Sequence, residues 1–407
     1  MLARLTMIEI NKNVILVSGA KNAAIYDFNA NKLYAINTEA LYIINRVVLK
    51  NEAPYTDVET TYISQLKQAN LISDNFAPRS FEMKPDNEIK LSFAWLELTE
   101  GCNLKCRHCY EGNDHRHSPN ELSTNQWKAI INDLYLNGCR KLQFTGGECL
   151  LRPDLSELIV YAADIGMTDI TVFTNASLLN DSVIDTLLKN KVKVRFSLYG
   201  HCANVHDAIT QRPGSFDKTI INVKKMMSLG IDVTPAVVIM KENENYIEQI
   251  KDYILSLCLN YSGYDVIREV YSGTQSSHIP VRQDVLDSKK KRSPSFQISK
   301  EKFNRALSHN TCWYGKFAIT PTGKVIPCIF ERNISLGDVT KQSISDILNS
   351  QSLRYHWNLD FSQVEFCKDC EYRFACKDCR PLGMAKCNDV KAKNPRCTYN
   401  PYTGTWQ

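Results

Sequence analysis

The sequence contains no run of eighteen or more apolar residues, which is the length that a membrane-spanning helix requires. It also lacks a recognisable secretory signal, because residues 1–9 include no apolar core of adequate length. Net charge is slight, since 49 Lys and Arg stand against 44 Asp and Glu and leave +5 over 407 residues. Nucleic-acid-binding proteins concentrate positive charge on one face, so this balance argues against nucleic acid, and the missing apolar run argues against a membrane.

A chain without a secretory signal is not expected to form disulfides, yet this one contains 15 cysteines. We therefore interpret the cysteines as metal ligands or free thiols and expect a reducing, cytoplasmic location. The hydrophobic fraction of 43% and the charged fraction of 23% are typical of a soluble globular protein. The length predicts two or three domains.

Residues 1–78 differ in pattern from the rest of the chain. Short strand-like runs at 14–17, 23–26 and 32–36 are followed by helical spacing at 38–48 and 57–69. This order predicts a small winged-helix-like domain, and a β-rich extension of the next domain is the alternative. Residues 79–90, which follow one proline and contain another, are predicted to be a linker.

Residues 91–300 predict an α/β domain, because strands and helices alternate along them. Strands are predicted at 91–98, 142–145, 169–174, 192–198, 233–239 and 265–267. Helices are predicted between them at 127–136, 155–163, 182–188, 216–229 and 245–257. Such alternation implies parallel strands with right-handed crossovers, in an open sheet or a barrel, with the reactive site at the carboxyl edge of the strands.

Three cysteines follow the first of these strands with the spacing C-x3-C-x2-C: Cys102, Cys106 and Cys109. Thiolates are the usual ligands of iron–sulfur clusters, and a cluster of four irons needs four ligands. Only three are local, so one iron would remain open for another ligand. A zinc site is the alternative for three cysteines, but their position at a strand end in an α/β chain favours the cluster.

This motif resembles that of the radical S-adenosylmethionine (AdoMet) superfamily, although His108 stands where the family favours an aromatic residue before the third cysteine. The resemblance implies a partial (β/α)6 TIM-like barrel. It also implies a [4Fe-4S] cluster whose open iron is chelated by AdoMet. In that family an electron from the cluster cleaves AdoMet, and the resulting 5′-deoxyadenosyl radical abstracts hydrogen from the substrate.

Further residues at the strand ends match the superfamily's AdoMet site. Gly146, Gly147 and Glu148 follow the second strand and resemble the motif that contacts the cofactor's amino group. Glycines let backbone approach a ligand closely, and a carboxylate suits an ammonium group. By the same resemblance Asn175 and Ser197 would contact the ribose and methionine portions, and Arg212 would reach the cofactor carboxylate; a structural hydrogen bond is the alternative for each of these three.

The cysteine-rich segment 301–407 resembles the SPASM domain, which holds two auxiliary iron–sulfur clusters. Too few apolar residues lie between its cysteines for an unaided core, so metal would have to support the fold. The resemblance assigns Cys312, Cys328 and Cys379 to the nearer cluster, with Cys387 as a candidate fourth ligand or a spare. It assigns Cys367, Cys370, Cys376 and Cys397 to the outer cluster. A nearer cluster without a fourth ligand would have an open iron, and tandem zinc ribbons are the alternative to both clusters.

The N-terminal domain resembles the RiPP recognition element, which binds the leader of a ribosomally made precursor peptide as an extra strand. Together the resemblances predict a radical AdoMet/SPASM peptide maturase, a RiPP-modifying oxidoreductase that installs a thioether or carbon–carbon cross-link. Its partners would be the precursor peptide and an external electron donor such as flavodoxin or ferredoxin. Glu269 and Tyr271 lie where a substrate-facing group is expected. The alternatives are an anaerobic sulfatase-maturing-type enzyme and a zinc-stapled binding protein without enzymatic activity.

Four cysteines fit none of these spacings. They are Cys139, Cys149, Cys202 and Cys258. Free cysteine often behaves as a small buried hydrophobe, and we expect that of all four.

Overall fold

The computed structural model describes residues 7–82, 89–110, 120–268 and 276–407. The chain divides into two compact units, which are described separately below. One comprises Met1–Glu88, Lys290–Tyr314 and Trp357–Gln407, and the other comprises Ile89–Lys289 and Gly315–His356. The predicted boundaries at 78, 90 and 300 remain predictions, and the cysteine-rich C-terminal segment contributes to both units. Over the described residues, every helix is too short or too polar to cross a membrane.

The second unit is built on one nine-stranded sheet, in the order β11-β10-β9-β8-β7-β6-β12-β13-β14. Its first six strands pair in parallel, which confirms the predicted α/β class. They are β6 (Phe93–Glu97), β7 (Lys141–Thr145), β8 (Asp169–Thr174), β9 (Lys193–Leu198), β10 (Val233–Ile239) and β11 (Asp265–Val266). Because they run in parallel, their carboxyl ends meet at one edge, where the cysteine loop lies.

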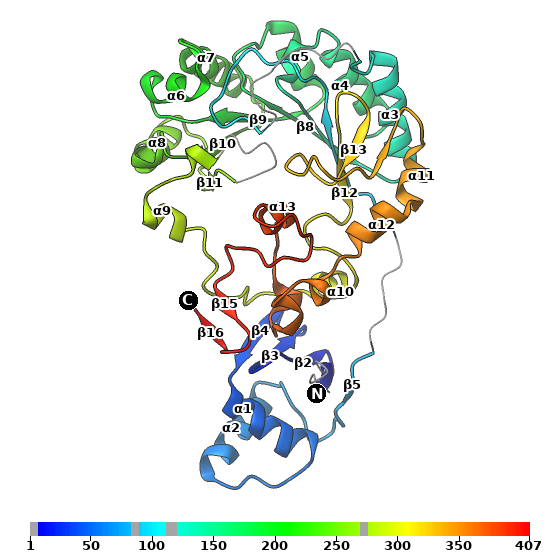
Figure 1. The fold of residues 1–407 in the computed structure, drawn as a ribbon, viewed down its shortest axis with the longest axis vertical. Helices are drawn as coiled ribbons and strands as arrows, with labels where there is room; N and C mark the ends of the chain where they lie inside the picture. The colour runs from blue at the N-terminus through cyan, green and yellow to red at the C-terminus, as the bar shows by residue number, and fades with distance from the viewer. Residues whose placement is uncertain (1–6, 83–88, 111–119, 269–275) are drawn as a thin grey trace. The chain divides into compact units, whose positions relative to one another are not determined.

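Helices connect these strands and gather around them, as Figure 1 shows. They are α3 (Thr124–Leu136), α4 (Leu155–Asp164), α5 (Asp181–Lys189), α6 (Ala203–Thr210), α7 (Ser215–Ser228) and α8 (Ile247–Ser256). Local signals explain where they start: Ser123 and Gln126 form a reciprocal capping box on α3, and Asn180 caps α5. The predicted helices are all present, with ends shifted by up to three residues; α6 is an addition.

Segment 315–356 extends this sheet. Strand β12 (Lys316–Ile319) pairs in parallel with β6, and β13 (Lys324–Ile326) returns antiparallel to β12. This pair forms a hairpin between Cys312 and Cys328. Strand β14 (Gly337–Asp338) and helices α11 (Ile344–Asn349) and α12 (Gln351–Trp357) follow. The first part of the predicted SPASM segment is therefore continuous with the barrel sheet.

The first unit contains a five-stranded antiparallel sheet, in the order β4-β3-β2-β1-β5. Strands β2 (Val14–Ser18), β3 (Ala23–Asp27) and β4 (Lys32–Ile36) match the three predicted strands, and β1 (Met7–Asn11) and β5 (Arg79–Ser80) are additional. Helix α1 (Thr38–Ile43) continues into a π-helical turn, η1 (Ile44–Leu49), and α2 (Asp57–Gln68) follows. Wide turns of this kind are rare and usually short.

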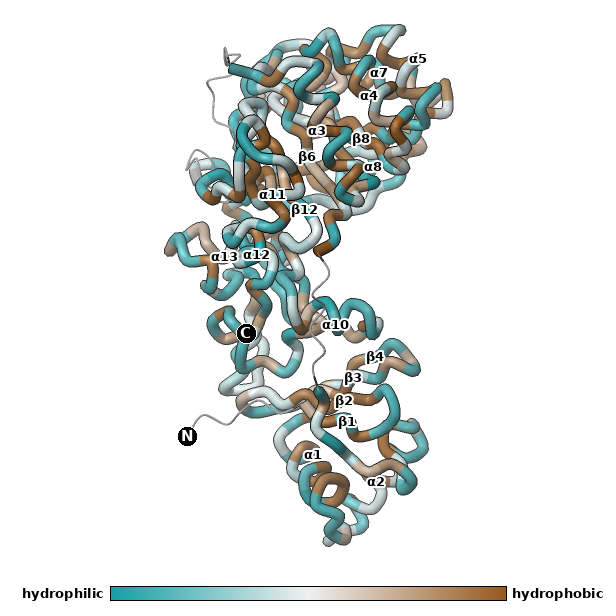
Figure 2. The backbone as a smooth tube through the Cα atoms, turned by 90° about the vertical axis from the view of Figure 1, so that its right-hand side faces the viewer, coloured by the Kyte–Doolittle hydropathy of each residue, from teal (hydrophilic) through white to brown (hydrophobic). Residues whose placement is uncertain are grey.

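Both faces of this sheet are buried, which explains the nearly continuous apolar runs in β2 and β3. Val14, Leu16 and Ile25 pack with residues of η1 and α2 on one face. Ile15 and Tyr26 pack on the other face with C-terminal aromatic residues, among them Phe303, Tyr372, Phe374 and Tyr399. Figure 2 shows the hydrophobic character of β2. The N-terminal sheet and the last fifty residues thus share one core.

The outer edge of β4 is partly covered by the chain's own backbone. Leu33 donates its N–H to the carbonyl of Phe296 at 2.9 Å, and Ile298 donates to Asn31 at 3.1 Å. Lys32 and Gln297 face each other in this short antiparallel bridge. An incoming peptide strand would therefore find only part of this edge uncovered.

Candidate functional site

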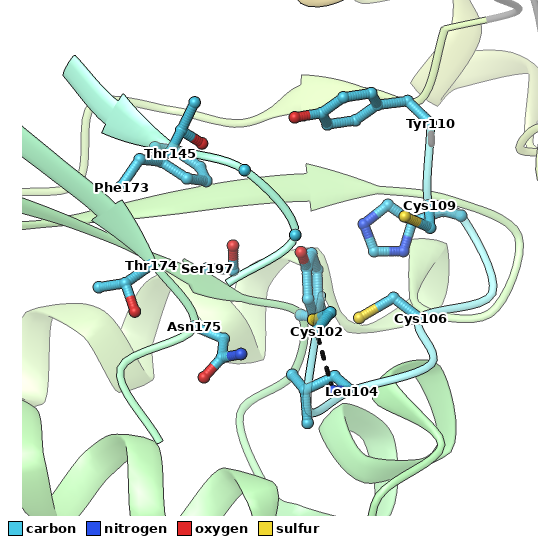
Figure 3. A pocket seen from close by; sticks show the side chains of 14 residues that line it. Cys102, Leu104, Cys106, Cys109, Tyr110, Thr145, Phe173, Thr174, Asn175 and Ser197 are labelled. Carbon is cyan, nitrogen blue, oxygen red and sulfur yellow. Dashed lines mark hydrogen bonds between the residues drawn. The ribbon is translucent and has the colours of Figure 1, made fainter. Parts of the chain in front are cut away.

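The cysteine loop is held against the ends of neighbouring elements by backbone hydrogen bonds. Lys105 donates its N–H to Thr210 at 3.1 Å, and Arg107 donates to Ile209 at 3.0 Å, both at the end of α6. Cys109 donates to Cys106 within the loop at 3.1 Å. These anchors fix the loop, and Figure 3 shows the three sulfur atoms turned toward a shared space beside the ends of β8 and β9.

The chemistry of these three thiols fits a cluster. Burial, followed by the charges of Cys102 and Cys109, raises the pKa of the Cys106 thiol well above its ordinary value. Buried thiolates that repel one another need a cation between them, and a bound metal deprotonates its thiol ligands. Among the described residues, no group of three or more His, Cys, Asp or Glu side chains is arranged around a single metal ion. The three thiols would hold an iron–sulfur cluster, whose usual ligands are cysteine thiolates.

The glycine pair after β7 packs directly on the backbone that leads to Cys102. Gly147 donates its N–H to Thr99 and Glu148 donates to Gly101, both at 2.8 Å. A Cβ atom on Gly147 would lie 2.3 Å from the Gly101 carbonyl oxygen and 2.6 Å from that of Glu100. Gly146 adopts a φ of +139°, which side-chain-bearing residues rarely adopt. The backbone conformation at Gly146 and the close backbone contact at Gly147 therefore both require glycine.

Gly147→Ala is expected to displace the cysteine loop and to reduce AdoMet cleavage by about tenfold or more, with about 1–3 kcal/mol of lost stability from overpacking. The clash is with backbone, which cannot rotate away. A suitable control is Gly230→Ala. A Cβ atom there would meet no other atom within 4 Å, so the substitution strains the backbone at φ +81° without a steric clash. The measurement is 5′-deoxyadenosine formation together with the unfolding midpoint. Equal losses in the two variants would contradict the steric argument.

The Glu148 side chain is engaged by the end of β8. Its buried carboxylate accepts hydrogen bonds from Thr174 Oγ1 at 2.6 Å, from the backbone N–H of Asn175 at 2.7 Å and from that of Leu150 at 3.0 Å. Burial raises the pKa of Glu148, and these donors act in the opposite direction. The carboxylate therefore positions Asn175 beside the pocket. A direct contact with the cofactor's amino group remains a prediction.

The three sulfurs line a pocket of about 110 Å³ at the carboxyl edge of the sheet. Gly146, Gly147, Asn175 and Ser197 also line it, so the structure brings these predicted residues together with the cysteines. Asn175 donates its amide to Asn103 Oδ1 at 2.8 Å, which ties it to the cysteine loop. Arg212 is exposed in the turn between α6 and α7 and is not among the residues that line the pocket.

A larger cavity of about 490 Å³ adjoins this pocket. The two share His108, Tyr110, Thr145, Phe173, Ser197 and Tyr199, so the spaces are continuous. The His108 and Tyr199 rings meet edge to face, with centroids 4.5 Å apart. Burial lowers the pKa of His108 to about 4, so its imidazole is neutral at pH 7. This histidine, which departs from the family pattern, thus packs where the two spaces join.

The sequence reasoning missed the lining of the larger cavity. Arg195 on β9, Trp95 on β6 and Gln143 on β7 all line it. Alternation along a strand could have placed Arg195 on the same face as Ser197, since residues two apart point the same way. Glu269 and Tyr271, the two expected substrate-facing residues, lie outside the described residues.

The cysteines assigned to the outer cluster influence one another electrostatically. Burial raises the pKa of Cys367, and the charges of Cys376, Asp378 and Cys397 add to the rise. Burial also raises the pKa of Cys370, with Cys376 and Cys367 among the smaller causes. Lys291 approaches Cys376 with Nζ 3.6 Å from Sγ. A nearby cation suits a cluster of thiolates, which carries net negative charge. The assignment of these four cysteines to one cluster remains a prediction.

The nearer-cluster residues are divided between the two units. Cys312 and Cys379 belong to one unit and Cys328 to the other, and this ligand set remains a prediction. Cys387 is exposed. Of the four cysteines outside any set, Cys139 and Cys149 are buried as expected and Cys202 is half-buried. The expectation was wrong for the fourth, Cys258, which is exposed at a left-handed backbone position after α8.

Two family descriptions match separate parts of the chain. Residues 96–254 match the radical SAM superfamily, and residues 312–371 match the SPASM iron–sulfur cluster-binding domain. The first match spans β6 to α8, with the cysteine loop and the glycine pair. The second begins at Cys312 and ends just after Cys370.

Curated relatives include proteins of two kinds. The antilisterial bacteriocin subtilosin biosynthesis protein AlbA of Bacillus subtilis (strain 168) is 27% identical over 341 residues, which cover 79% of this chain and 74% of AlbA. An AdoMet-dependent heme synthase of Oleidesulfovibrio alaskensis is 24% identical over 344 residues, which cover 76% of this chain and 87% of that protein.

Solved structures share the fold. Native anSMEcpe with bound AdoMet aligns with a TM-score of 0.59 at 17% identity, over 77% of this chain and 94% of that one. Streptococcus suis SuiB bound to precursor peptide SuiA aligns with a TM-score of 0.58 at 14% identity, over 97% of this chain and all of that one. Because the radical SAM and SPASM matches lie in one chain around the cysteines described above, the protein belongs to the radical SAM superfamily and is an enzyme that carries a SPASM iron–sulfur domain.

Proposed function

We propose that this enzyme is a peptide maturase that binds a ribosomally made precursor peptide and forms a cross-link within it. The observation that carries the proposal is that the cysteine-lined pocket opens into a larger cavity of about 490 Å³. The first space presents the three thiols and the glycine pair to the cluster and AdoMet. The second is large enough to admit an amino-acid side chain with its neighbouring backbone. When bound, the cluster and AdoMet supply a 5′-deoxyadenosyl radical that abstracts hydrogen from the substrate.

The chain's own residues would orient the reaction. Asn175, Ser197 and the backbone of Gly146 and Gly147 would hold AdoMet at the strand ends, with Glu148 fixing the position of Asn175. Aromatic and apolar side chains along the larger cavity, such as Phe173, would exclude water from the substrate radical. A sulfur-to-carbon thioether is our first choice of product, and a carbon–carbon link is the second.

The N-terminal sheet would capture the leader of the precursor. A leader peptide could extend the antiparallel sheet as an additional strand, which is a common mode of peptide recognition. The likeness to SuiB supports this role, because it extends over 97% of the chain, including this sheet. The AlbA and SuiB descriptions both concern peptide products or precursors.

The auxiliary clusters would accept the electron that remains after the cross-link closes. The outer cluster would be held by Cys367, Cys370, Cys376 and Cys397, and the nearer one by Cys312, Cys328 and Cys379, with or without Cys387. An external flavodoxin or ferredoxin would reduce the AdoMet cluster in each turnover.

The test is anaerobic incubation of the reconstituted enzyme with AdoMet, dithionite and each short peptide encoded beside its gene. We expect 5′-deoxyadenosine and a peptide lighter by about two hydrogen atoms for each cross-link, because two bonds to hydrogen are lost when one new bond forms. Fragmentation by mass spectrometry locates the link, and alkylation reports whether a cysteine thiol was consumed. Cofactor cleavage with no change in any peptide would contradict the proposal.

Two other substrates are separated by the same assay. The heme synthase relatives make a tetrapyrrole the competing substrate, and iron coproporphyrin can be offered in place of the peptide. A sulfatase-maturing activity would oxidise a cysteine or serine in a protein without forming a link, and it would not require the N-terminal sheet. Colourless protein containing zinc and no iron would instead indicate a metal-stapled binding protein.

A further inference from the structure

Arg195 presents a guanidinium group to the larger cavity. It lies on β9, where Lys193, Arg195 and Ser197 occupy alternate positions on one face of the strand. Ser197 lines both the cofactor pocket and the larger cavity, and Arg195 lines the larger one. Two residues along a strand span about 6.6 Å, so Arg195 lies one side-chain position farther from the cysteine loop than Ser197.

Within the described part of the chain, the side chain of Arg195 makes no hydrogen bond or ion pair. The neighbouring cations differ in this respect. Lys193 pairs with Asp169 at 3.0 Å, and Arg268 pairs with Asp265 while its guanidinium lies 4.6 Å from the centre of the Phe330 ring. The described lining of the cavity therefore contains two guanidinium groups and one carboxylate, and that carboxylate already has its partner.

A guanidinium in this position is suited to bind a ligand. It stays charged at all physiological pH values, and its planar fork of donors matches the two oxygens of a carboxylate. The walls around it are largely apolar and include Phe173 on the adjacent strand β8 and Pro235 on β10. Such walls lower the local dielectric and strengthen an ion pair formed there. Arg195 is also exposed rather than packed into the sheet, so a ligand can reach it from the cavity.

We propose that Arg195 binds a carboxylate of the substrate and thereby selects which residue is placed beside the cofactor pocket. The inference rests on the proposed function and specifies its substrate class: a peptide with a carboxylate close to the site of hydrogen abstraction. An Asp or Glu side chain and the peptide's C-terminal carboxylate share this chemistry. A single guanidinium without a partner suits one carboxylate, whereas the propionates of a tetrapyrrole would require more than one.

The test measures binding to the reconstituted full chain by ligand-observed NMR. The probes are three synthetic peptides: Ac-Ala-Glu-Ala-NH2, Ac-Ala-Gln-Ala-NH2 and Ac-Ala-Ala-Ala with a free C-terminus. The wild type is compared with Arg195→Gln and Arg195→Lys. Lys193→Gln is the matched control, because it removes one positive charge from the same strand face outside the cavity lining.

For the wild type we expect the Glu peptide to bind about tenfold more tightly than the Gln peptide, as one charge-assisted hydrogen-bonded pair provides. Arg195→Gln should remove this preference, Arg195→Lys should keep part of it, and Lys193→Gln should keep it fully. A preference for the free C-terminus instead would assign the carboxylate to the peptide's end. Both results support the subsite.

The proposal is overturned if the wild type does not distinguish the three peptides, or if Arg195→Gln keeps the preference. Tighter binding of iron coproporphyrin III than of any peptide would overturn the peptide assignment. The unfolding midpoint of each variant shows whether it is folded. Because binding requires no turnover, failure here is distinguishable from failure of the proposed reaction, which is measured by 5′-deoxyadenosine formation in the same preparations.

Discussion

Replacing Cys102, Cys106 and Cys109 together with alanine is expected to abolish 5′-deoxyadenosine formation, down to the level of a reaction without enzyme. The three thiols are the only cysteines that line the cofactor pocket among the described residues. Three clusters of four irons hold about twelve irons, so the variant should retain about eight. The measurements are iron and sulfide content and the anaerobic cleavage assay.

The matched control is Cys258→Ala, which removes one exposed thiol after α8 and should preserve both iron content and cleavage. Loss of all twelve irons in the triple variant would show that the auxiliary clusters depend on the first one. Cleavage that persists in the triple variant would contradict the assignment of the motif. An iron content of about four in the wild type would keep the radical core and remove both auxiliary clusters.

Much of the fold could be predicted from the sequence because its signals are local. The alternation of apolar runs with helical periodicity defined six parallel strands, and the order of the chain then placed their carboxyl ends together. The position of the cysteine loop and of the glycine pair followed from that order. The hydrogen bonds from Gly147 and Glu148 to the backbone before Cys102 show why a motif on the second strand must accompany the cysteines.

Other features could not be predicted, because they depend on contacts between residues distant in sequence. The covering of the β4 edge by Phe296–Ile298 pairs segments more than 260 residues apart, with no local signal in either. The carboxylate of Glu148 is turned toward Thr174 and does not line the pocket, because two donors at the end of β8 and the backbone N–H of Leu150 bind it. Arg195 was missed because it alternates with Lys193 and Ser197 opposite an apolar face, and such a polar face is typical of solvent exposure until the fold of the sheet is known.

Segment 315–356 contributes a buried ion pair to the barrel, and no local sequence pattern predicts it. Glu97 at the end of β6 is fully buried, and Arg332 donates to both of its carboxylate oxygens, at 2.8 and 2.9 Å. Burial raises the pKa of Glu97, and the charge and hydrogen bonds of Arg332 oppose that rise. Glu97 lies five residues before Cys102, so loss of this ion pair should disturb the cysteine loop.

Arg332→Met is expected to destabilise the enzyme by about 3–5 kcal/mol near pH 8, because it leaves a buried carboxylate without its partner. Without Arg332, the pKa of Glu97 in the folded state rises further above its value of about 4.3 in an unfolded chain. A group with a raised folded pKa favours the folded state while protonated, and that stability is lost as the pH rises through the folded pKa. The deficit of the variant should therefore be smaller near pH 6 than near pH 8.

Urea unfolding of the wild type, Arg332→Met and the double variant Glu97→Gln/Arg332→Met at both pH values checks this expectation. The double variant removes the titrating group, so its deficit relative to the wild type should change little between pH 6 and pH 8. A deficit of Arg332→Met that is equal at the two pH values would instead assign the loss to the packing of the arginine's aliphatic stem. AdoMet cleavage by Arg332→Met near pH 8 should fall together with its stability, since the strand that carries Glu97 leads directly into the ligands of the cluster.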